Sequence, residues 1–321
     1  MNNQKIGCFV ISLDTELAWG SFDKGLTPEK VKEFNATRIC IKQLLNVFNK
    51  FQITATFAFV GHLMLSECNE VGGIKHPNLV RVKHDWYKRD WFTEDPASNI
   101  YCDPMWYGAD VLEMVQNSEQ KHEIASHSFS HIIYGDKGCS RQCAESDIQE
   151  CIKVAKEKGI TLTSFVFPRN SEGHKDVLKE NGFSAYRGDG NEWYKAVKNK
   201  TLQKAFHLID ELFIFSPKTS IPIKDQFGLY KTIGNMLYLS RSGLRRYIPI
   251  SNRVSKAKKG INKAICNKEV FHMWFHPFNL ASDPEGLIKG LDEICSYVRK
   301  KIDEGVLTNL TITDLCRKNM E

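Results

Sequence analysis

The 321-residue sequence predicts a single α/β domain, residues 1–321, folded as a distorted or incomplete (β/α) barrel. Short apolar runs of strand length alternate with longer segments of helical periodicity, which is typical of βα units rather than of a helical bundle or a β-sandwich. No internal repeat or low-complexity linker divides the chain. Its 42% hydrophobic and 26% charged residues are ordinary for a globular protein.

Six apolar runs are the predicted strands, and helical segments separate them. The runs cover residues 7–13, 53–60, 123–126, 163–167, 183–186 and 270–275. Three helices are predicted from their end signals: one begins at Thr27-Pro28, one covers residues 140–158, and one begins at Asp283-Pro284 and ends before Gly305. Each has a capping residue before the first turn, together with Pro at the first helical position or Gly after the last one.

The N-terminal segment does not resemble a signal peptide or a membrane span. Its apolar stretch, residues 6–13, is short and is followed at once by acidic residues. We therefore expect a cytoplasmic protein, in which the ten cysteines are reduced thiols. Cys139, Cys143 and Cys151 form a cluster whose spacing predicts buried positions on a helix rather than a metal site.

The positive charge is concentrated in one segment. The net charge is +6, and residues 241–268 contain nine basic residues and no Asp or Glu. This segment is expected to be either a solvated surface or a patch for peripheral contact with an anionic glycan, a lipid-linked substrate or a membrane surface. Nucleic acid is not an expected partner, because the segment lacks interleaved aromatic residues and no nucleic-acid-binding module is recognisable.

Chemically reactive side chains follow two of the predicted strands. Asp14 and Glu16 come at the end of the first strand, where a period of two puts both carboxylates on one face. His127 and His131 follow the strand 123–126, and a spacing of four on a helical turn directs both imidazoles to the same side. Two histidines and a carboxylate at the strand ends of a barrel predict a metal site.

Two further strands end in polar residues. Arg169 follows the fourth predicted strand, where it is expected to neutralise and orient a nearby carboxylate. His276 follows the strand 270–275, and an imidazole there can exchange a proton near neutral pH. His272 lies within that strand and is expected to be buried and hydrogen-bonded.

In this order the motifs resemble the polysaccharide deacetylase (NodB-like) family. The shared features are an acidic motif after the first strand, a His-Ser-x-x-His motif, an Arg-Pro motif and a late His after the last strand. Residues 55–61 (ATFAFVG) and 122–127 (HEIASH) are also similar to that family. The resemblance covers residues 6–280 and implies a TIM-like barrel of the deacetylase type.

The resemblance also implies a metal site. The family's metal-binding histidines fall on His127 and His131, and its metal-binding carboxylate falls on Glu16, because Thr15 occupies the adjacent position. Glu is longer than the Asp common in the family, so another acid is the alternative third ligand. The expected cofactor is a divalent metal ion, with Zn²⁺ favoured and other divalent transition metals open.

The catalytic roles implied by the resemblance fall on three other residues. The general base is Asp14, the general acid is His276, and the arginine that tethers the base is Arg169, although here Pro precedes Arg instead of following it. For the family's Asp-Trp motif only Asp189 and Trp193 are similar, and no role is assigned to them.

The implied function is that of a hydrolase acting on carbon–nitrogen bonds other than peptide bonds. It would cleave an N-acetyl amide on a carbohydrate during surface-glycan biosynthesis and release acetate. In the absence of an export signal, a nucleotide-linked or lipid-linked sugar is the expected substrate. Two alternatives stay open: a cytoplasmic amidohydrolase acting on a small cyclic imide or ureide, and a glycan-binding protein without activity.

An aromatic-rich insertion, residues 84–107, interrupts the alternation of strands and helices. It contains seven Trp, Tyr and Phe residues among charges and prolines and has no clear period. It is expected either to pack as a long loop over the barrel or to offer flat aromatic faces to a sugar ring. Trp106 and Tyr107 are the candidate substrate-binding residues.

Overall fold

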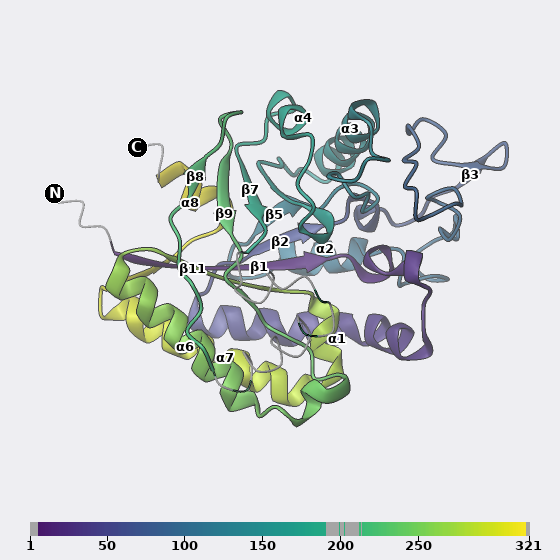
Figure 1. The fold of residues 1–321 in the computed structure, drawn as a ribbon. Coiled ribbons are helices and arrows are strands. Elements are labelled where there is room, and N and C mark those ends of the chain that lie inside the picture. The colour runs from purple at the N-terminus through teal and green to yellow at the C-terminus, as the bar shows by residue number, and fades with distance from the viewer. Residues whose placement is uncertain (1–5, 191–198, 200–201, 203–211, 213, 319–321) are drawn as a thin grey trace.

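A curled, mainly parallel sheet forms the centre of the protein (Figure 1). The computed structural model describes residues 6–190, 199, 202, 212 and 214–318. The strands of this sheet are β1 (Gly7–Thr15), β2 (Thr56–Phe59), β5 (Glu123–Ser126), β6 (Ser164–Val166), β7 (Ala185–Gly188), β8 (Ile223–Lys224), β9 (Tyr230–Ile233), β10 (Met236–Leu237), β11 (Val270–Phe275) and β12 (Leu307–Asn309). Their order is β10-β11-β1-β2-β5-β6-β7-β9-β8, and β12 pairs with β1 beside this path. The six predicted strands and the incomplete (β/α) barrel are confirmed.

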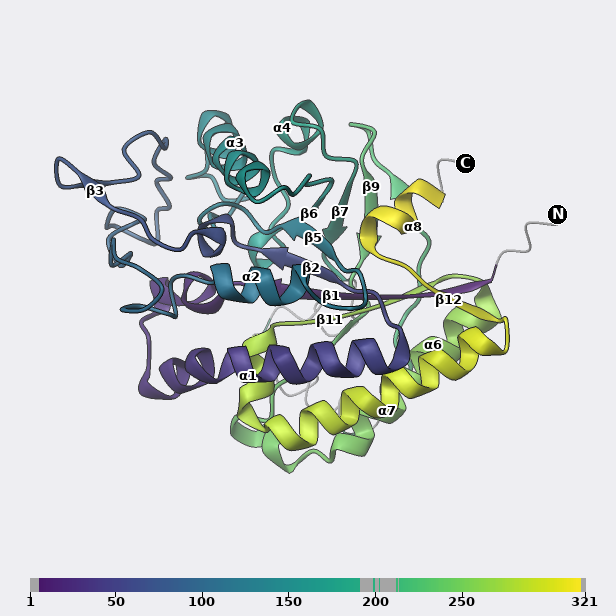
Figure 2. The same ribbon diagram turned by 180° about the vertical axis from the view of Figure 1, so that it is seen from behind.

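Helices cover the outside of the curled sheet, except α8 (Ile312–Lys318), which packs at the end of its interior where the strands begin. The other described helices are α1 (Pro28–Phe51), α2 (Ala109–Gln116), α3 (Arg141–Glu157), α4 (Lys175–Glu180), α6 (Ile250–Asn267) and α7 (Pro284–Asp303). Figures 1 and 2 show α1, α6 and α7 together on one side of the sheet and α3 and α4 on the other. The caps of the three predicted helices are present, since Thr27, Ser140 and Asp283 each accept a hydrogen bond from a first-turn backbone N–H. No helix in the described ranges is long and apolar enough to cross a membrane.

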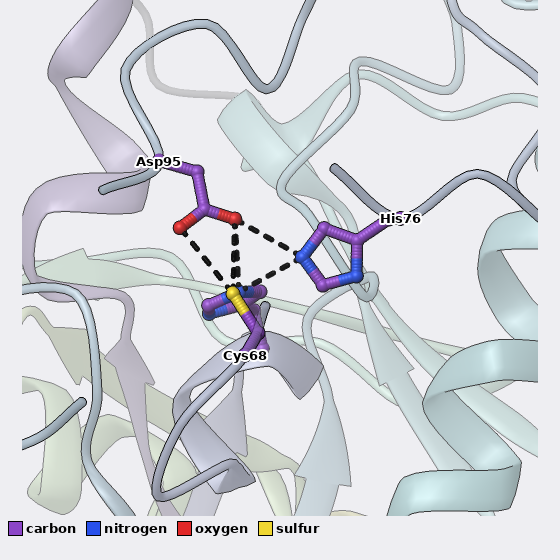
Figure 3. Close-up of side chains that lie close together, drawn as sticks. Cys68, His76 and Asp95 are labelled. Atoms are coloured by element: carbon purple, nitrogen blue, oxygen red, sulfur yellow. Dashed lines mark hydrogen bonds and ion pairs between the residues drawn. The ribbon is translucent and has the colours of Figure 1, made fainter. Parts of the chain in front are cut away.

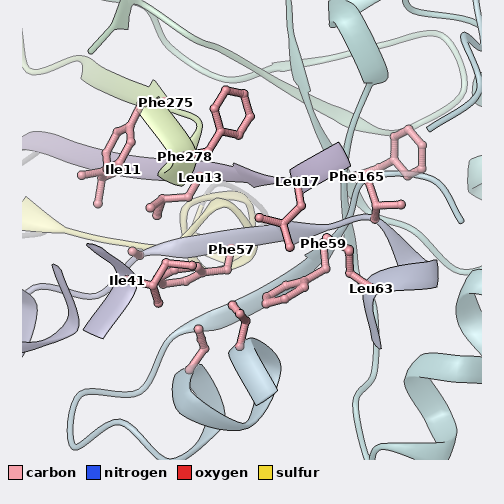
Figure 4. Packing of buried hydrophobic residues seen from close by; sticks show 14 of the residues in the cluster. Ile11, Leu13, Leu17, Ile41, Phe57, Phe59, Leu63, Phe165, Phe275 and Phe278 are labelled. Carbon is pink, nitrogen blue, oxygen red and sulfur yellow. The ribbon is translucent and has the colours of Figure 1, made fainter. Parts of the chain in front are cut away.

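Alternation along β1 divides its side chains between two environments. Phe9, Ile11 and Leu13 point toward the helices and are fully buried in the main hydrophobic cluster. Cys8 and Val10 belong to a separate cluster inside the curled sheet. The neighbouring strands keep this register. On the helix side, Leu13 is therefore aligned with Phe57 of β2 and Phe275 of β11, as Figure 4 shows.

The interior of the barrel is apolar at one end and polar at the other. At the end where the strands begin, Ile312, Leu315 and Cys316 of α8 pack against inward-facing strand residues. Toward the carboxyl ends of the strands the same inward register carries polar groups instead. These buried groups are Ser12 and Asp14 of β1, Arg187 of β7 and His272 of β11. The open polar end is therefore the place for a functional site, as in closed (β/α) barrels.

The basic segment 241–268 is in part structural. It forms a short 3-10 helix, Gly243–Tyr247, and then α6. Arg253 and Lys256 are buried, and the Arg253 guanidinium donates to backbone carbonyls that include those of Leu239 and Ile248. Arg253 therefore stabilises the fold, and neither buried cation is exposed to an external partner. Whether the remaining cations contact a glycan or a membrane stays a prediction.

The loop that joins β5 to α3 is folded around one buried carboxylate, that of Asp147 on α3. Its Oδ1 accepts hydrogen bonds from the Ser128 hydroxyl (2.7 Å), the Phe129 backbone N–H (2.8 Å) and the Tyr134 hydroxyl (2.9 Å). Its Oδ2 accepts from the backbone N–H (3.1 Å) and the hydroxyl (2.9 Å) of Ser130. The expected helical turn between His127 and His131 is therefore wrong: the segment is an irregular loop, because its backbone N–H groups bond to Asp147 instead of to a helical ladder.

Replacing Asp147 by Asn tests this role of the carboxylate. Each Asp147 oxygen accepts a hydrogen bond from a backbone N–H. In either orientation of the Asn side chain, its NH₂ group would therefore face one of these N–H donors and could not accept from it. We expect Asp147→Asn to lower the free energy of unfolding by about 1–3 kcal/mol, measured by urea denaturation. Glu157→Gln, an exposed position at the end of the same helix, is the control and should have no measurable effect. An unchanged midpoint for Asp147→Asn would contradict the assignment.

Candidate metal centre and active site

The carboxyl ends of β1, β5 and β11 bring five predicted residues together. Asp14 is the last inward-facing residue of β1, and Glu16 follows directly after the strand. His127 and His131 lie in the loop after β5, and His276 follows β11. Residues more than 100 positions apart in the sequence therefore form one cluster.

Three of these residues form a compact set of metal-ligand types. Nε2 of His127 lies 3.2 Å from Glu16 Oε2, and Nε2 of His131 lies 3.1 Å from the same oxygen. The two imidazole centres are 5.1 Å apart. All three side chains are almost completely buried. Tetrahedral Zn²⁺ with bonds of about 2.0–2.1 Å would separate its nitrogen and oxygen ligands by about 3.3 Å, which is close to these two distances.

The hydrogen bond on the far side of His127 favours a metal ligand. Nδ1 of His127 lies 2.7 Å from the Val166 carbonyl oxygen, which can only accept, so Nδ1 carries the proton. In the neutral ring, Nε2 then presents its lone pair to Glu16. A backbone acceptor that fixes the tautomer in this way is the usual environment of a metal-binding histidine. The donor set therefore fits a divalent cation.

The electrostatics of the cluster keep Glu16 ionised. Burial alone would raise the pKa of Glu16, but the neighbouring imidazoles of His276, His131 and His127 hold it well below its usual value. Burial lowers the pKa of His131, although Glu16 opposes this shift, and so favours the neutral imidazole that a metal requires.

The backbone after β1 makes room for Glu16. Thr15 lies on the opposite face of the strand from Asp14, so it cannot join the cluster. Glu16 leaves the strand and extends along Gly20, where any Cβ would collide with its carboxylate. The longer side chain and the absence of a Cβ at position 20 together place a carboxylate beside the two histidines.

Asp14 is held by an arginine that the sequence analysis did not select. Nη1 and Nη2 of Arg187 each donate to one Asp14 oxygen, at 2.6 Å, and both side chains are buried. Burial alone would raise the pKa of Asp14, but the guanidinium and the nearby imidazoles outweigh it and hold the pKa below its usual value. Asp14 is therefore a carboxylate at neutral pH.

The tethering role predicted for Arg169 is not supported by its position. Arg169 follows β6 in a short 3-10 turn, Pro168–Asn170, and has a left-handed backbone (φ 54°). Its guanidinium pairs with Asp23 at 2.6 Å and lies over the ring of the half-exposed Trp86. The turn thus carries Arg169 to the rim of the site, while the next residue, Asn170, accepts a hydrogen bond from Arg187.

A hydrogen-bonded chain behind Arg187 fixes its position. Arg187 also donates to the Ser12 hydroxyl, Ser12 contacts Nε2 of His272 at 2.8 Å, and Nδ1 of His272 contacts Thr232. Burial lowers the pKa of His272 to about 3, so this imidazole is neutral. The prediction that His272 is buried and hydrogen-bonded is confirmed.

Strand periodicity was the signal that could have identified Arg187. It follows the predicted strand 183–186 directly and lies two residues after the inward-facing Ala185. The residues similar to the Asp-Trp motif, Asp189 and Trp193, follow Arg187 in the sequence, and Trp193 lies outside the described residues.

His276 faces both carboxylates from the rim. Its Nε2 lies 3.4 Å from Glu16 Oε1 and 3.9 Å from Asp14 Oδ2, and its side chain is 23% exposed. The amide nitrogen of Asn279 lies 3.5 Å from its Nδ1, which leaves Nε2 as the protonated atom of the neutral ring. The 3-10 helix that follows, Pro277–Ser282, packs on α1 through Phe278 and Phe34. His276 is therefore placed to exchange a proton with a group near Asp14.

Trp106 and Tyr107 do not face a substrate. Their exposed fractions are 4% and 0%, and both rings belong to the main hydrophobic cluster. The Tyr107 hydroxyl accepts from the Ser98 backbone N–H, and the Trp106 carbonyl accepts from the Trp19 indole. The prediction that these rings bind a sugar is therefore wrong, because they form the buried base of the insertion that covers the barrel.

Comparison with known proteins identifies the family. A family model described as polysaccharide deacetylase matches residues 14–183, which is more than half of the chain. No curated protein matches the sequence significantly.

Solved structures share the fold at low sequence identity. A protein from Mycobacterium smegmatis assigned as a polysaccharide deacetylase has a TM-score of 0.57 at 11% identity and covers 96% of this chain and 94% of its own. One from Pseudomonas aeruginosa with the same assignment has a TM-score of 0.57 at 10% identity, with coverage of 97% and 89%. A 4-α-glucanotransferase from Thermococcus litoralis has a TM-score of 0.54 at 13% identity, covering 98% of this chain and 41% of its own.

These likenesses show the fold, while the family match shows descent. The chain therefore belongs to the polysaccharide deacetylase family, whose members are hydrolases that act on carbohydrates and generally use a divalent metal.

Proposed function

We propose that this protein is a metal-dependent deacetylase that hydrolyses an N-acetyl amide of a carbohydrate and releases acetate and an amino sugar. One observation carries the proposal: a buried metal-ligand set, a carboxylate held ionised by Arg187 and a partly exposed imidazole all face the same point. We further propose that the substrate is a nucleotide-linked or lipid-linked sugar of surface-glycan synthesis.

The side chains divide the reaction between them. A divalent metal, Zn²⁺ by its donor set, held by Glu16, His127 and His131 would polarise the amide carbonyl and acidify a water molecule. Asp14 accepts the proton of the attacking water, and Arg187 stabilises its ionised form beforehand. His276 donates a proton to the nitrogen as the carbon–nitrogen bond breaks, so that an amine leaves instead of an amide anion.

Acetate release tests the proposed reaction. We expect the purified protein to release acetate from at least one member of a panel of N-acetylated sugar nucleotides, lipid-linked sugars and oligosaccharides. It should leave cyclic imides and ureides unopened. Removal of the metal with a chelator should abolish acetate release, and added Zn²⁺ should restore it. Ring opening of an imide without acetate release would contradict the proposal.

Substitution of the two histidines supplies the control for the metal. His127→Ala combined with His131→Ala should lower the bound divalent metal by one equivalent in elemental analysis and abolish acetate release. His174→Ala, which changes a histidine of the α4 N-terminus, should affect neither quantity. An undiminished metal content in the double variant would remove Glu16, His127 and His131 as the site.

Asp14→Asn separates the general base from the metal ligands. The amide cannot accept the proton of water, so we expect acetate release to fall by roughly 100-fold or more while the metal content stays unchanged. Asp110→Asn is the matched control, since Asp110 also accepts two hydrogen bonds from one arginine, Arg38, but joins α1 to α2. A loss of metal together with activity in Asp14→Asn would mean that Asp14, not Glu16, is the ligand.

His276→Ala tests the general acid through the leaving group. An amine cannot leave an amide unprotonated, whereas an aryl oxide leaves an activated acetate ester readily. We therefore expect a loss of roughly 100-fold or more in N-deacetylation but less than about tenfold in aryl acetate hydrolysis, with unchanged metal content. Both rates are measured on one preparation. Equal losses for the two substrates would assign His276 to packing at the rim.

A further inference from the structure

A second cluster of metal-ligand types lies between β2 and α2, in residues 60–108, a longer segment that contains the aromatic-rich residues 84–107 and is called the insertion from here on. Among the described residues, two groups combine at least three His, Cys, Asp or Glu side chains within ligand distance: the one around Glu16, and His62, Cys68, His76 and Asp95. Figure 3 shows Cys68, His76 and Asp95 pointing toward one another from separate loop segments. We name these four residues the insertion cluster.

Four of the six distances within the insertion cluster are close to the edges of a tetrahedral metal site, and all four ligand atoms lie within 4.8 Å of one another. Nε2 of His62 and Nε2 of His76 are 3.1 Å apart, and they lie 3.2 and 3.0 Å from Asp95 Oδ2. Cys68 Sγ lies 3.6 and 3.5 Å from the two oxygens of Asp95. Zn²⁺ bonds of about 2.0–2.1 Å to N or O and 2.3 Å to S imply edges of about 3.3 Å, and about 3.5 Å where sulfur takes part.

Hydrogen bonding alone leaves this arrangement unsatisfied. Nδ1 of His62 lies 3.3 Å from the Trp106 carbonyl oxygen and therefore carries a proton, as Nδ1 of His127 does at the first site. In the neutral tautomer with a proton on Nδ1, Nε2 of His62 carries a lone pair. If His76 Nε2 is protonated, it can donate to His62 Nε2 or to Asp95 Oδ2. In both cases the lone pair of His62 Nε2 still faces Asp95 Oδ2, at 3.2 Å. A cation between the four atoms removes this repulsion.

The surrounding contacts orient the ligands as they do in known metal sites. The Ala97 backbone N–H donates to Asp95 Oδ1 at 3.0 Å, which leaves Oδ2 for the two imidazoles. The Tyr107 hydroxyl lies 3.2 Å from Cys68 Sγ and accepts the Ser98 backbone N–H at 2.8 Å. Such outer contacts fix the rotamers of metal ligands.

We propose that His62, Cys68, His76 and Asp95 bind one Zn²⁺ ion as a structural site distinct from the Glu16 site. Two neutral imidazoles, a thiolate and a carboxylate carry two negative charges, which a divalent cation neutralises in a buried position. The Cys68 thiol releases its proton to water on binding. Four protein ligands leave no position for a substrate, and a sulfur, nitrogen and oxygen donor set in a tetrahedron favours Zn²⁺ over Mg²⁺ or Ca²⁺.

The role of the ion is to fold the insertion and brace the loop of the first site. The only helices or strands within residues 65–107 are the two-residue strands β3 (Glu70–Val71) and β4 (Ile74–Lys75). Regular secondary structure therefore contributes little to the stability of this segment. The backbone N–H of His62 donates to the Phe129 carbonyl at 2.8 Å, between His127 and His131. The ring of Phe129 contacts both His62 and His76. Binding at the insertion cluster therefore supports the backbone that carries the first metal site.

Elemental analysis of the full-length protein, after removal of any affinity tag, tests this proposal. We expect two equivalents of divalent metal in the wild type and a loss of one equivalent, identified as Zn²⁺, in Cys68→Ser and in His76→Gln. Cys102→Ser is the matched control, because Cys102 is an exposed cysteine of the same insertion, and should retain both equivalents. The same metal content in the wild type and in both cluster variants would overturn the site.

Cobalt substitution distinguishes the two metal sites. Cys68 is the one sulfur ligand in either cluster, so a thiolate-to-Co²⁺ charge-transfer band in the near ultraviolet reports on the insertion cluster alone. The band should persist when His127 and His131 are both replaced by Ala and should vanish in Cys68→Ser. A cobalt-loaded wild type without this band would refute the proposal even if deacetylation is confirmed, and the band would support it even if deacetylation is not.

Thiol labelling of the wild type makes the test independent of how well the variants fold. In the metal-loaded protein Cys68 should resist alkylation, and a chelator should expose it, whereas Cys102 should react under both conditions. The apparent melting temperature should fall on chelation because the ion binds only the folded insertion. Equal alkylation of Cys68 with and without chelator would contradict a bound thiolate.

Discussion

The carboxylate of Asp147 is the constraint on which the site depends. It accepts five hydrogen bonds from the loop between β5 and α3, and the same loop carries His127 and His131. Ser128 and His131 both have left-handed backbones there, a conformation that non-glycine residues keep only when their surroundings enforce it. Without the Asp147 carboxylate, the N–H and hydroxyl groups of the loop would lose their acceptor. The two imidazoles would then no longer be held facing the same point.

The side chains of each strand alternate between the two faces of the curled sheet, and this separates the packing residues from the residues of the site. Outward-facing strand residues pack against helices, while inward-facing ones are apolar beside α8 and polar at the opposite end. The Arg187 cation can be buried because Asp14 and Ser12 accept hydrogen bonds from it, and Asp14 can be buried as an anion because Arg187 compensates its charge. The charge that the reaction needs is thus stabilised before any substrate binds.

The insertion packs over the barrel, which was one of the two roles expected from its composition. Four of its seven aromatic side chains are buried, and one of these, Trp91, donates from its indole to the Ser130 carbonyl at 2.7 Å. Together with the contacts of His62 to Phe129, this ties the insertion to the loop of the first metal site. The two ligand clusters share one arrangement. In each, the Nδ1–H of a histidine donates to a backbone carbonyl, and its Nε2 faces a carboxylate.

The sequence alone determined six of the strands, the three capped helices and the family, because periodicity, capping and short motifs are local properties. It also selected the five residues that meet at the strand ends, since that edge is common to all parallel strands of a barrel. Only the tertiary structure decided that Arg187 rather than Arg169 holds Asp14, because the turn after β6 places the Arg169 guanidinium beside Asp23. Only the tertiary structure brought His62, Cys68, His76 and Asp95 together, since a loop without a repeat gives no spacing from which contacts can be predicted.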